Sequence, residues 1–136
     1  MKNLIFCLLF LSCSNVEEKY IPQEIVTNDT ITNIINDERI DKGLNELKSE
    51  KLLTELSKTK AIQMESEGKV NHNGFTNLEV HSEIFSQIAA YGFKSDLGLF
   101  NGYMASAEHK DKILGNYTHI GSYTYKSYNC ILFAKY

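Results

Sequence analysis

The sequence is poor in the residues that cross-link or anchor small folds: it has no tryptophan, one proline and three cysteines among 136 residues. Cys7 and Cys13 lie in or beside an apolar leader, so Cys130 is the only cysteine in the part of the chain expected to fold. This count excludes a disulfide framework, which needs pairs of cysteines within the folded domain. We expect Cys130 to be a free, buried thiol or a reactive thiol of minor importance.

A strong charge of either sign is also missing. The formal net charge is -3, and no basic run with interleaved aromatic residues is visible. Proteins that bind nucleic acid carry a concentrated positive field, so we expect no nucleic-acid partner. The length supports one domain with a real core once a leader is removed.

The clearest pattern lies at the amino terminus, where a weakly basic segment, residues 1–3, precedes an apolar run at residues 4–11. Ser12 then places a small residue directly before Cys13. This pattern is typical of a bacterial lipoprotein signal peptide at residues 1–12, with Cys13 acylated as the first mature residue. The alternatives are a transmembrane anchor and a cleaved secretory peptide, although a spanning helix needs roughly 20 apolar residues.

Residues 13–27 are mostly polar, contain the single proline, Pro22, and show no sustained periodicity. We interpret them as a lipidated tether that precedes a folded domain at residues 28–136. Acyl chains on Cys13 hold such a domain at a bilayer without inserting it. The expected location is the cell envelope, at the outer membrane or the cell surface.

Apolar residues at helical spacing predict three helices in the first part of the domain. A glycine follows the first and the second of them, as is common at helix ends. Ser49 is the expected N-cap of the second helix, and the first two helices are expected to pack together over a common core. The expected helices span residues 27–42, 50–67 and 97–104.

A fourth helix is predicted within the stretch from Tyr103 to Gly121. Ser106, a residue type that caps helix amino termini, precedes Ala107, Glu108 and His109. His109 then lies in the first turn, where the positive end of the helix dipole disfavours the imidazolium. Its neutral ring keeps a lone pair for a metal or a hydrogen bond.

The carboxy-terminal residues predict a β-hairpin. Residues 118–125 and 128–136 are rich in aromatic and β-branched side chains, with Lys126 and Ser127 as the turn. Apolar residues occur on both faces of the last strand. Both faces of the sheet are therefore expected to be covered, as in a helix/sheet/helix arrangement.

Two polar residues between the second and third helices are candidates for chemistry. His72 lies in a turn-rich segment just past the second helix, where an imidazole can point into a cleft. Glu83 has apolar neighbours, and burying a carboxylate is costly unless a partner compensates it. Glu83 is therefore either solvent-facing or matched to a cation, a metal or a histidine.

The order and spacing of these features resemble the CAP superfamily, the group of cysteine-rich secretory, antigen 5 and pathogenesis-related proteins, in its short bacterial form. The resemblance spans about residues 30–136. It implies an α+β fold, a three-layer α/β/α sandwich around a small, mainly antiparallel sheet, with a surface cleft. The residues that carry it are Asn36, Arg39, Gly43, Leu44, Leu47, Leu53, Ala61, Met64, His72, Ser82, Glu83, Ile84, Ser106, His109, Ile113, Leu114, Ile120, Gly121 and Phe133.

In many family members two histidines and two glutamates line the cleft, and in some they bind a divalent metal. The resemblance assigns the first histidine to His72, one glutamate to Glu83 and the second histidine to His109. This sequence departs from the family on both sides of that glutamate, at a common tryptophan and at the second glutamate. The residues at those positions are Ser82, Ile84, Tyr103 and Ser106.

Two imidazoles and a carboxylate form a chemically sensible zinc set with a fourth position open for water. The opposing interpretation, which we favour because only three ligands can be named, is a hydrogen-bonded cluster that ties helices to the sheet. A nucleophilic pair of Ser106 and His109 is explained more simply by helix capping. His81 and His119 have no family role, and we expect both to be solvated.

We expect a binding or host-interaction module that works through its surface cleft, with a lipid, a sterol, a peptide or a host protein as partner. One alternative is a metal-dependent, peptidase-like hydrolase that uses the cleft. Another is a structural or antigenic surface lipoprotein. No cofactor is expected to be required, and zinc is the one candidate. A fold supports many functions, so the resemblance alone does not decide among these three.

Overall fold

The computed structural model describes residues 19–25, 29–75 and 80–136. The predicted signal peptide and Cys13 lie outside the described residues. Within the described ranges no helix is both long and apolar enough to cross a membrane.

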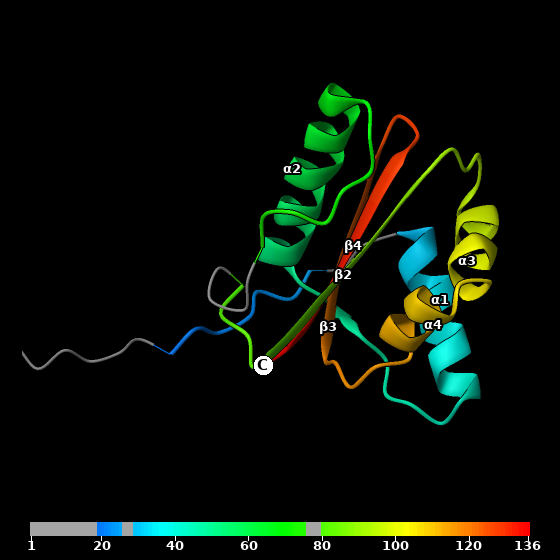
Figure 1. Ribbon diagram of the computed structural model, residues 1–136. Helices are drawn as coiled ribbons and strands as arrows, with labels where there is room; N and C mark the ends of the chain where they lie inside the picture. Colours follow the sequence, from blue (N-terminus) through cyan, green and yellow to red (C-terminus); the bar gives the residue numbers. More distant parts are fainter. Residues whose placement is uncertain (1–18, 26–28, 76–79) are drawn as a thin grey trace, which may run out of the picture.

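The fold has three layers, with a sheet between two layers of helices (Figure 1). Helix α2 covers one face of the sheet, and α1, α3 and α4 cover the other. The strand order is β1-β3-β4-β2, with β1 parallel to β3 and the other pairs antiparallel. The predicted α+β sandwich is confirmed. Its elements are α1 (Thr30–Asp41), β1 (Lys48–Ser49), α2 (Lys51–Glu67), β2 (Ile84–Tyr91), α3 (Asp96–Met104), α4 (Ala107–Ile113), β3 (His119–Tyr125) and β4 (Tyr128–Lys135).

The predicted hairpin forms the centre of the sheet, and its two faces bury different side chains. Cys130 and Leu132 of β4 face α2, where they pack with Leu53 and Met64. Ile131 and Phe133 belong to the core on the other side, together with residues of α1, α3 and α4. Side chains along a strand point alternately to its two faces, so β4 contributes side chains to both cores. Burial raises the pKa of the Cys130 thiol to about 12, so this free cysteine is an inert core residue, as expected.

The expected packing of the first two helices on each other is wrong. Helices α1 and α2 lie on opposite faces of the sheet (Figure 1). The chain crosses between these faces through β1, whose two residues pair with the start of β3. A strand of two residues has no periodicity to detect, so the sequence pattern favours a simple helical hairpin.

The expected N-cap of α2 is also displaced by one residue. Glu50, not Ser49, is the cap, and its carboxylate accepts a hydrogen bond of 2.8 Å from the Leu53 N–H. The same carboxylate accepts a 2.6 Å bond from the Tyr20 hydroxyl. Glu50 is fully buried. These bonds compensate the loss of water around its charge.

Residues 19–25, which fall within the predicted tether, lie along β1, and we call them the N-terminal strap. The Lys51 N–H donates to the Gln23 carbonyl at 2.9 Å, and the Ile25 N–H donates to the Ser49 carbonyl at 3.0 Å. With the Tyr20–Glu50 bond, these contacts attach the strap to the start of α2.

Arg39, the only arginine in the sequence, is buried in α1 and fixes the chain around α4. Its Nη1 donates to the carbonyls of Ile113 and Gly115 at 2.8 and 2.9 Å, and its Nε donates to the Asn45 carbonyl at 2.9 Å. A guanidinium presents several donors in a fixed plane, which suits carbonyls from two segments. Arg39 therefore holds the carboxy-terminal end of α4 against α1.

The backbone of helix α2 lies directly against Gly121 of β3. A Cβ atom at this position would lie 2.2 Å from the Leu53 carbonyl carbon and 2.3 Å from the Thr54 nitrogen. The Ser57 hydroxyl donates to the Gly121 carbonyl at 2.9 Å. Only glycine permits this backbone-to-backbone contact.

We predict that Gly121→Ala lowers the free energy of unfolding by about 3 kcal/mol, because α2 must move away from β3 to admit a methyl group. Urea unfolding followed by circular dichroism measures the change. Gly98→Ala, on α3, is the matched control. There the nearest atom outside the adjoining backbone is the Ser95 hydroxyl at 3.1 Å, so the expected change is within about 1 kcal/mol. Equal losses in both variants would contradict the close contact.

Candidate functional site

Two of the three predicted cleft residues share one region of the surface. His72 lies in the loop after α2, and His109 lies on α4. The charges of Glu108 and Lys112 act on both imidazoles. We call His72, Glu108, His109 and Lys112 the histidine site.

The loop that carries His72 is held by a buried lysine of α2. Lys60 is fully buried, and its ammonium donates to the Asn71 side-chain oxygen and to the Asn73 carbonyl. These two acceptors flank His72 on either side. Burial lowers the pKa of Lys60, in keeping with an ammonium whose partners are neutral. Lys60 thus positions the backbone on both sides of the first histidine.

The second histidine lies on a helix whose start matches the prediction. Ser106 is the N-cap residue of α4, although its side chain makes no capping hydrogen bond, and His109 is in the first turn. The His109 ring meets the Tyr103 ring edge-on, with centroids 5.2 Å apart. Tyr103 is buried, and its hydroxyl donates to the Asn129 side-chain oxygen at 2.7 Å. Tyr103 therefore supports the imidazole from beneath.

An ion pair borders the two rings. The Lys112 ammonium donates to Glu108 Oε1 at 2.8 Å, one helical turn apart, and approaches the Gln87 carbonyl of β2 at 3.4 Å. The hydrogen bond from Lys112 lowers the pKa of Glu108, which stays ionised. The i, i+4 spacing of Glu108 and Lys112 is a signal from which this pair can be predicted.

Both imidazoles are held in the neutral form. Burial is the main cause that lowers the pKa of His72, and the Lys112 charge adds to it while Glu108 opposes it. Burial also lowers the pKa of His109, again with Glu108 opposing and Lys112 adding. A neutral imidazole offers one N–H donor and one lone pair. At neutral pH the site therefore presents two such rings beside a compensated ion pair.

Glu83, the third predicted member, lies elsewhere, at the start of β2. It directly precedes the strand, and its backbone N–H donates to the Lys135 carbonyl at 2.8 Å. Lys112 meets the same strand at Gln87, four residues further on, or roughly 13 Å along an extended chain. Glu83 is exposed, and its charge is not among those acting on either imidazole. The carboxylate beside the histidines is Glu108, which directly precedes His109.

Within the described part of the chain, the donors at the histidine site are too few for a tight zinc centre. Among residues 19–25, 29–75 and 80–136, no three histidine, cysteine, aspartate or glutamate side chains form a group that could hold a metal. Glu108, the carboxylate next to the imidazoles, is already paired with Lys112. A tight zinc site needs at least three protein ligands in tetrahedral positions. Two imidazoles alone do not meet that requirement.

The other two histidines differ from each other. His81 is exposed, as expected, and stacks on the Tyr20 ring with centroids 4.9 Å apart. The expectation that His119 is solvated is wrong, because only 8% of its surface is exposed. It begins β3, the strand that lies between β1 and β4. Neither histidine belongs to the histidine site.

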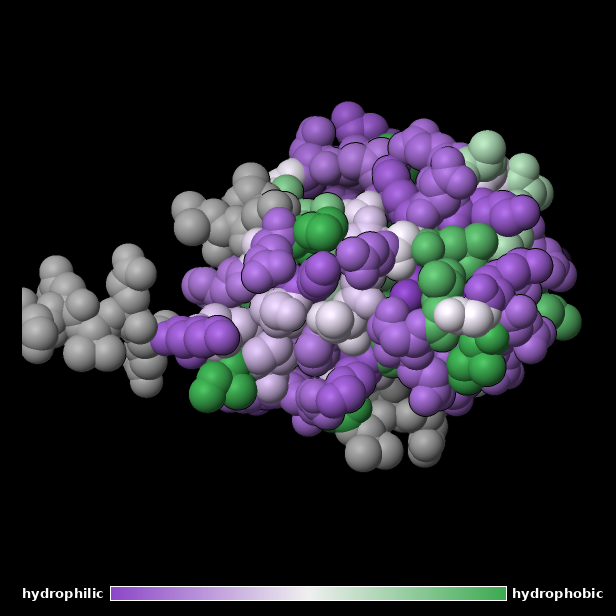
Figure 2. Space-filling view, turned by 90° about the horizontal axis from the view of Figure 1, so that it is seen from below, coloured by the Kyte–Doolittle hydropathy of each residue, from purple (hydrophilic) through white to green (hydrophobic). Residues whose placement is uncertain are grey.

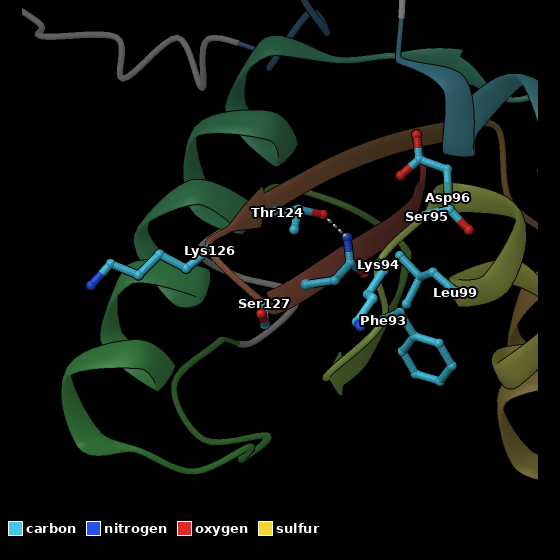
Figure 3. Close-up of a pocket in the computed structure, with 9 residues that line it drawn as sticks. Phe93, Lys94, Ser95, Asp96, Leu99, Thr124, Lys126 and Ser127 are labelled. Carbon is cyan, nitrogen blue, oxygen red and sulfur yellow. Dashed lines mark hydrogen bonds between the residues drawn. The ribbon is translucent and has the colours of Figure 1, made fainter.

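A small polar pocket of about 130 Å³ lies between the start of α3 and the turn that joins β3 to β4 (Figure 3). Three of its lining residues take part in local hydrogen bonds. The Asn129 amide donates to the Thr124 hydroxyl at 2.9 Å, and the Ser95 hydroxyl accepts the Gly98 N–H at 3.1 Å. The pocket lies at the end of the sheet. Its hydrogen bonds cap the start of α3 and stabilise the turn between β3 and β4.

Seen from below, the surface is mainly hydrophilic (Figure 2). The largest hydrophobic group in this view lies on the side that carries α1, α3 and α4. Ile40, on the last turn of α1, is 51% exposed. The hydrophobic groups are separated by polar side chains, so this face offers no continuous apolar platform.

We predict that Lys112→Met raises the pKa of both His72 and His109, because the variant removes a positive charge that disfavours both imidazolium ions. Glu108→Gln is expected to lower both values. The measurement is an NMR titration of the imidazole C–H signals. Lys110→Met, on the same helix, is the control and is expected to leave both titrations unchanged. If the pKa values of the two imidazoles are the same in Lys112→Met as in the wild type, the arrangement of the site is contradicted.

Three comparisons with known proteins place this geometry in context. Residues 32–134 match the model of a family described as CAP, the cysteine-rich secretory protein family. A search of curated proteins found no match.

Solved structures with the same fold include three bacterial proteins. An outer surface protein of Borrelia burgdorferi has a TM-score of 0.72 and 22% identity, over 85% of this chain and 98% of its own. An extracellular protein of Bacillus anthracis that contains an SCP domain has a TM-score of 0.73 and 14% identity, over 84% of this chain and 45% of its own. A cysteine-rich secretory protein of Staphylococcus aureus has a TM-score of 0.67 and 20% identity, over 78% of this chain and 37% of its own. This chain thus spans less than half of the last two proteins.

Proposed function

Because this chain belongs to the CAP, or cysteine-rich secretory protein, family, we propose that it is a binding module of the cell envelope that recognises a peptide segment of a partner protein. The proposed binding surface is the histidine site. The proposed attachment is a lipid on Cys13, which places the domain at the outer membrane or the cell surface. The structures with the same fold include an outer surface protein and an extracellular protein, in keeping with this location.

The observation that carries the proposal is the placement of two imidazoles, those of His72 and His109, beside the Glu108–Lys112 ion pair. Each imidazole supplies one donor and one acceptor, which match the C=O and N–H groups of a peptide. Tyr103 packs edge-on against the His109 ring, and Lys60 holds the residues on both sides of His72, so this part of the surface is partly ordered before binding. Glu108 and Lys112 add charges that select the partner's side chains.

A zinc-dependent hydrolase remains the second candidate, because His72 and His109 lie in the same neighbourhood. Its weakness is the missing third ligand among the described residues. A structural or antigenic surface lipoprotein is the third candidate. It requires no ligand, so it predicts that the histidine site is dispensable for every interaction.

We predict that Cys13→Ser abolishes incorporation of radiolabelled palmitate and moves the protein from the membrane fraction to the soluble fraction, because the thiol is the expected site of acylation. Cys7→Ser, within the leader, is the matched control and is expected to retain the label. Equal labelling of both variants would dismiss the anchor and leave the binding proposal untouched.

We predict that selection of a phage-displayed random-peptide library on the full-length protein enriches peptides whose affinity falls about tenfold in the His72→Ala/His109→Ala variant. The loss of two hydrogen-bonding rings accounts for that factor. His81→Ala is the control and is expected to bind as the wild type does. Calorimetric titration with each peptide, in zinc and in EDTA, measures the affinities.

The three candidate functions give different results in this experiment. Affinity that does not depend on zinc supports the binding module. Zinc-dependent cleavage of the peptides, lost in the double variant, identifies the hydrolase instead. Failure to enrich any peptide on the wild type overturns the proposal in favour of a structural role.

A further inference from the structure

A second hollow, separate from the histidine site, lies between the N-terminal strap and the start of β3. It has a volume of about 520 Å³, within the range of pockets that hold small organic molecules. Ile21 and Pro22 of the strap and the rings of Tyr20 and Tyr136 provide its apolar walls. Glu24, His119 and Lys19 provide its polar atoms. We call it the strap pocket.

The strap pocket contains a buried polar atom that has no hydrogen-bond partner among the described residues. His119 is 8% exposed, and its Nε2 makes no hydrogen bond to the described part of the chain. Leaving such atoms unpaired is unfavourable. Native structures satisfy most of them, so an occupant of this pocket is expected to supply a partner.

The tautomer of His119 follows from the groups around its ring. The other ring nitrogen, Nδ1, lies 2.8 Å from the Thr118 hydroxyl. That hydroxyl already accepts the Tyr136 N–H at 3.2 Å, and its alternative acceptor, the Ala134 carbonyl, is distant at 3.4 Å. The Thr118 hydroxyl is therefore assigned as the donor and Nδ1 as the acceptor of this hydrogen bond. The ring proton then lies on Nε2. Nε2–H then points to the pocket as a donor.

An acceptor lies opposite this donor at a distance that excludes a direct bond. Glu24 Oε1 is 3.8 Å from His119 Nε2 and is held by the Lys48 ammonium at 2.8 Å. A hydroxyl oxygen between the two can accept from Nε2–H and donate to the Glu24 carboxylate at normal distances. A carboxylate ligand would face the charge of Glu24, and an ammonium ligand would leave Nε2–H unpaired. The pair of groups therefore favours a neutral hydroxyl over either charged group.

We propose that the strap pocket binds a small neutral alcohol, with its hydroxyl between His119 and Glu24 and its aliphatic body against Ile21, Pro22 and Tyr136. The aromatic rings continue the apolar wall, since the His119 and Tyr136 rings meet edge-on with centroids 5.1 Å apart. This inference is independent of the histidine site, because the two share no residue.

The test uses 1-hexanol as the probe and the full-length protein labelled for methyl NMR. Saturable shifts of the Ile21 methyl signals, with nuclear Overhauser contacts from hexanol to Ile21 and Tyr136, are expected. In the series from 1-butanol to 1-heptanol, each added methylene is expected to tighten binding about fourfold. Hexanoate and hexylamine, which have the same chain, are expected to bind at least tenfold more weakly.

Two variants separate the hydroxyl contact from simple filling of an apolar space. His119→Phe keeps a ring but removes Nε2–H, and Glu24→Met, on the exposed strap, removes the acceptor with little risk to folding. Each is expected to weaken hexanol binding about tenfold, whereas His81→Phe is expected to have no effect, because His81 stacks on Tyr20 but does not line the pocket. Wild-type affinity in Glu24→Met and His119→Phe overturns the proposal. So does the absence of saturation, which would mean that water alone satisfies His119.

Discussion

The contact between α2 and β3 at Gly121 determines how closely α2 packs on its face of the sheet, and with it the positions of the segments that α2 carries. With no side chain between them, the backbone of α2 lies directly on the strand, and the Ser57 hydroxyl ties it to the Gly121 carbonyl. This contact sets the depth of α2, and with it the position of Lys60 one turn further on. Lys60 in turn fixes the loop that carries His72. The placement of a surface histidine therefore depends on a glycine inside the sheet.

Much of this fold is predictable because the hairpin carries its own signal. Aromatic and β-branched residues on either side of Lys126 and Ser127 define two strands, and apolar residues on both faces require two layers of helices. The ends of α1 and α2 follow from Gly43 and Gly68, which adopt the positive φ values expected after a helix. These features are local, so the amino-acid order alone contains them.

What cannot be predicted depends on partners that are distant in sequence. Strand β1 has two residues and exists because β3 accepts it, and Glu50 is buried because Tyr20 and the end of α2 supply donors. A solitary glutamate or a two-residue strand has no pattern of its own. The side of the sheet on which α2 lies follows from that short crossing, so the prediction of two stacked helices fails with it.

The candidate site shows the same limit at the level of single residues. His72 and His109, which the family resemblance assigns to one cleft, lie in one neighbourhood, and among the described residues the carboxylate beside them is Glu108. The pairing of β2 with β4 decides this outcome, since it carries Glu83 to the end of the sheet at Lys135. Register is a property of two strands together. An assignment made on one strand alone does not determine which residue faces α4.

Three buried charges explain how irregular segments reach defined positions in a domain without disulfides. Arg39, Glu50 and Lys60 are fully buried, and none has a salt-bridge partner among the described residues. A buried charge is tolerated only when hydrogen bonds replace its water. Helices and strands have few free groups to offer, so the partners come from loops, from helix ends and from the strap. Each charge thereby organises one irregular segment: Arg39 the end of α4, Glu50 the N-terminal strap and Lys60 the loop of His72. The histidine site and the strap pocket are the surfaces that these segments create.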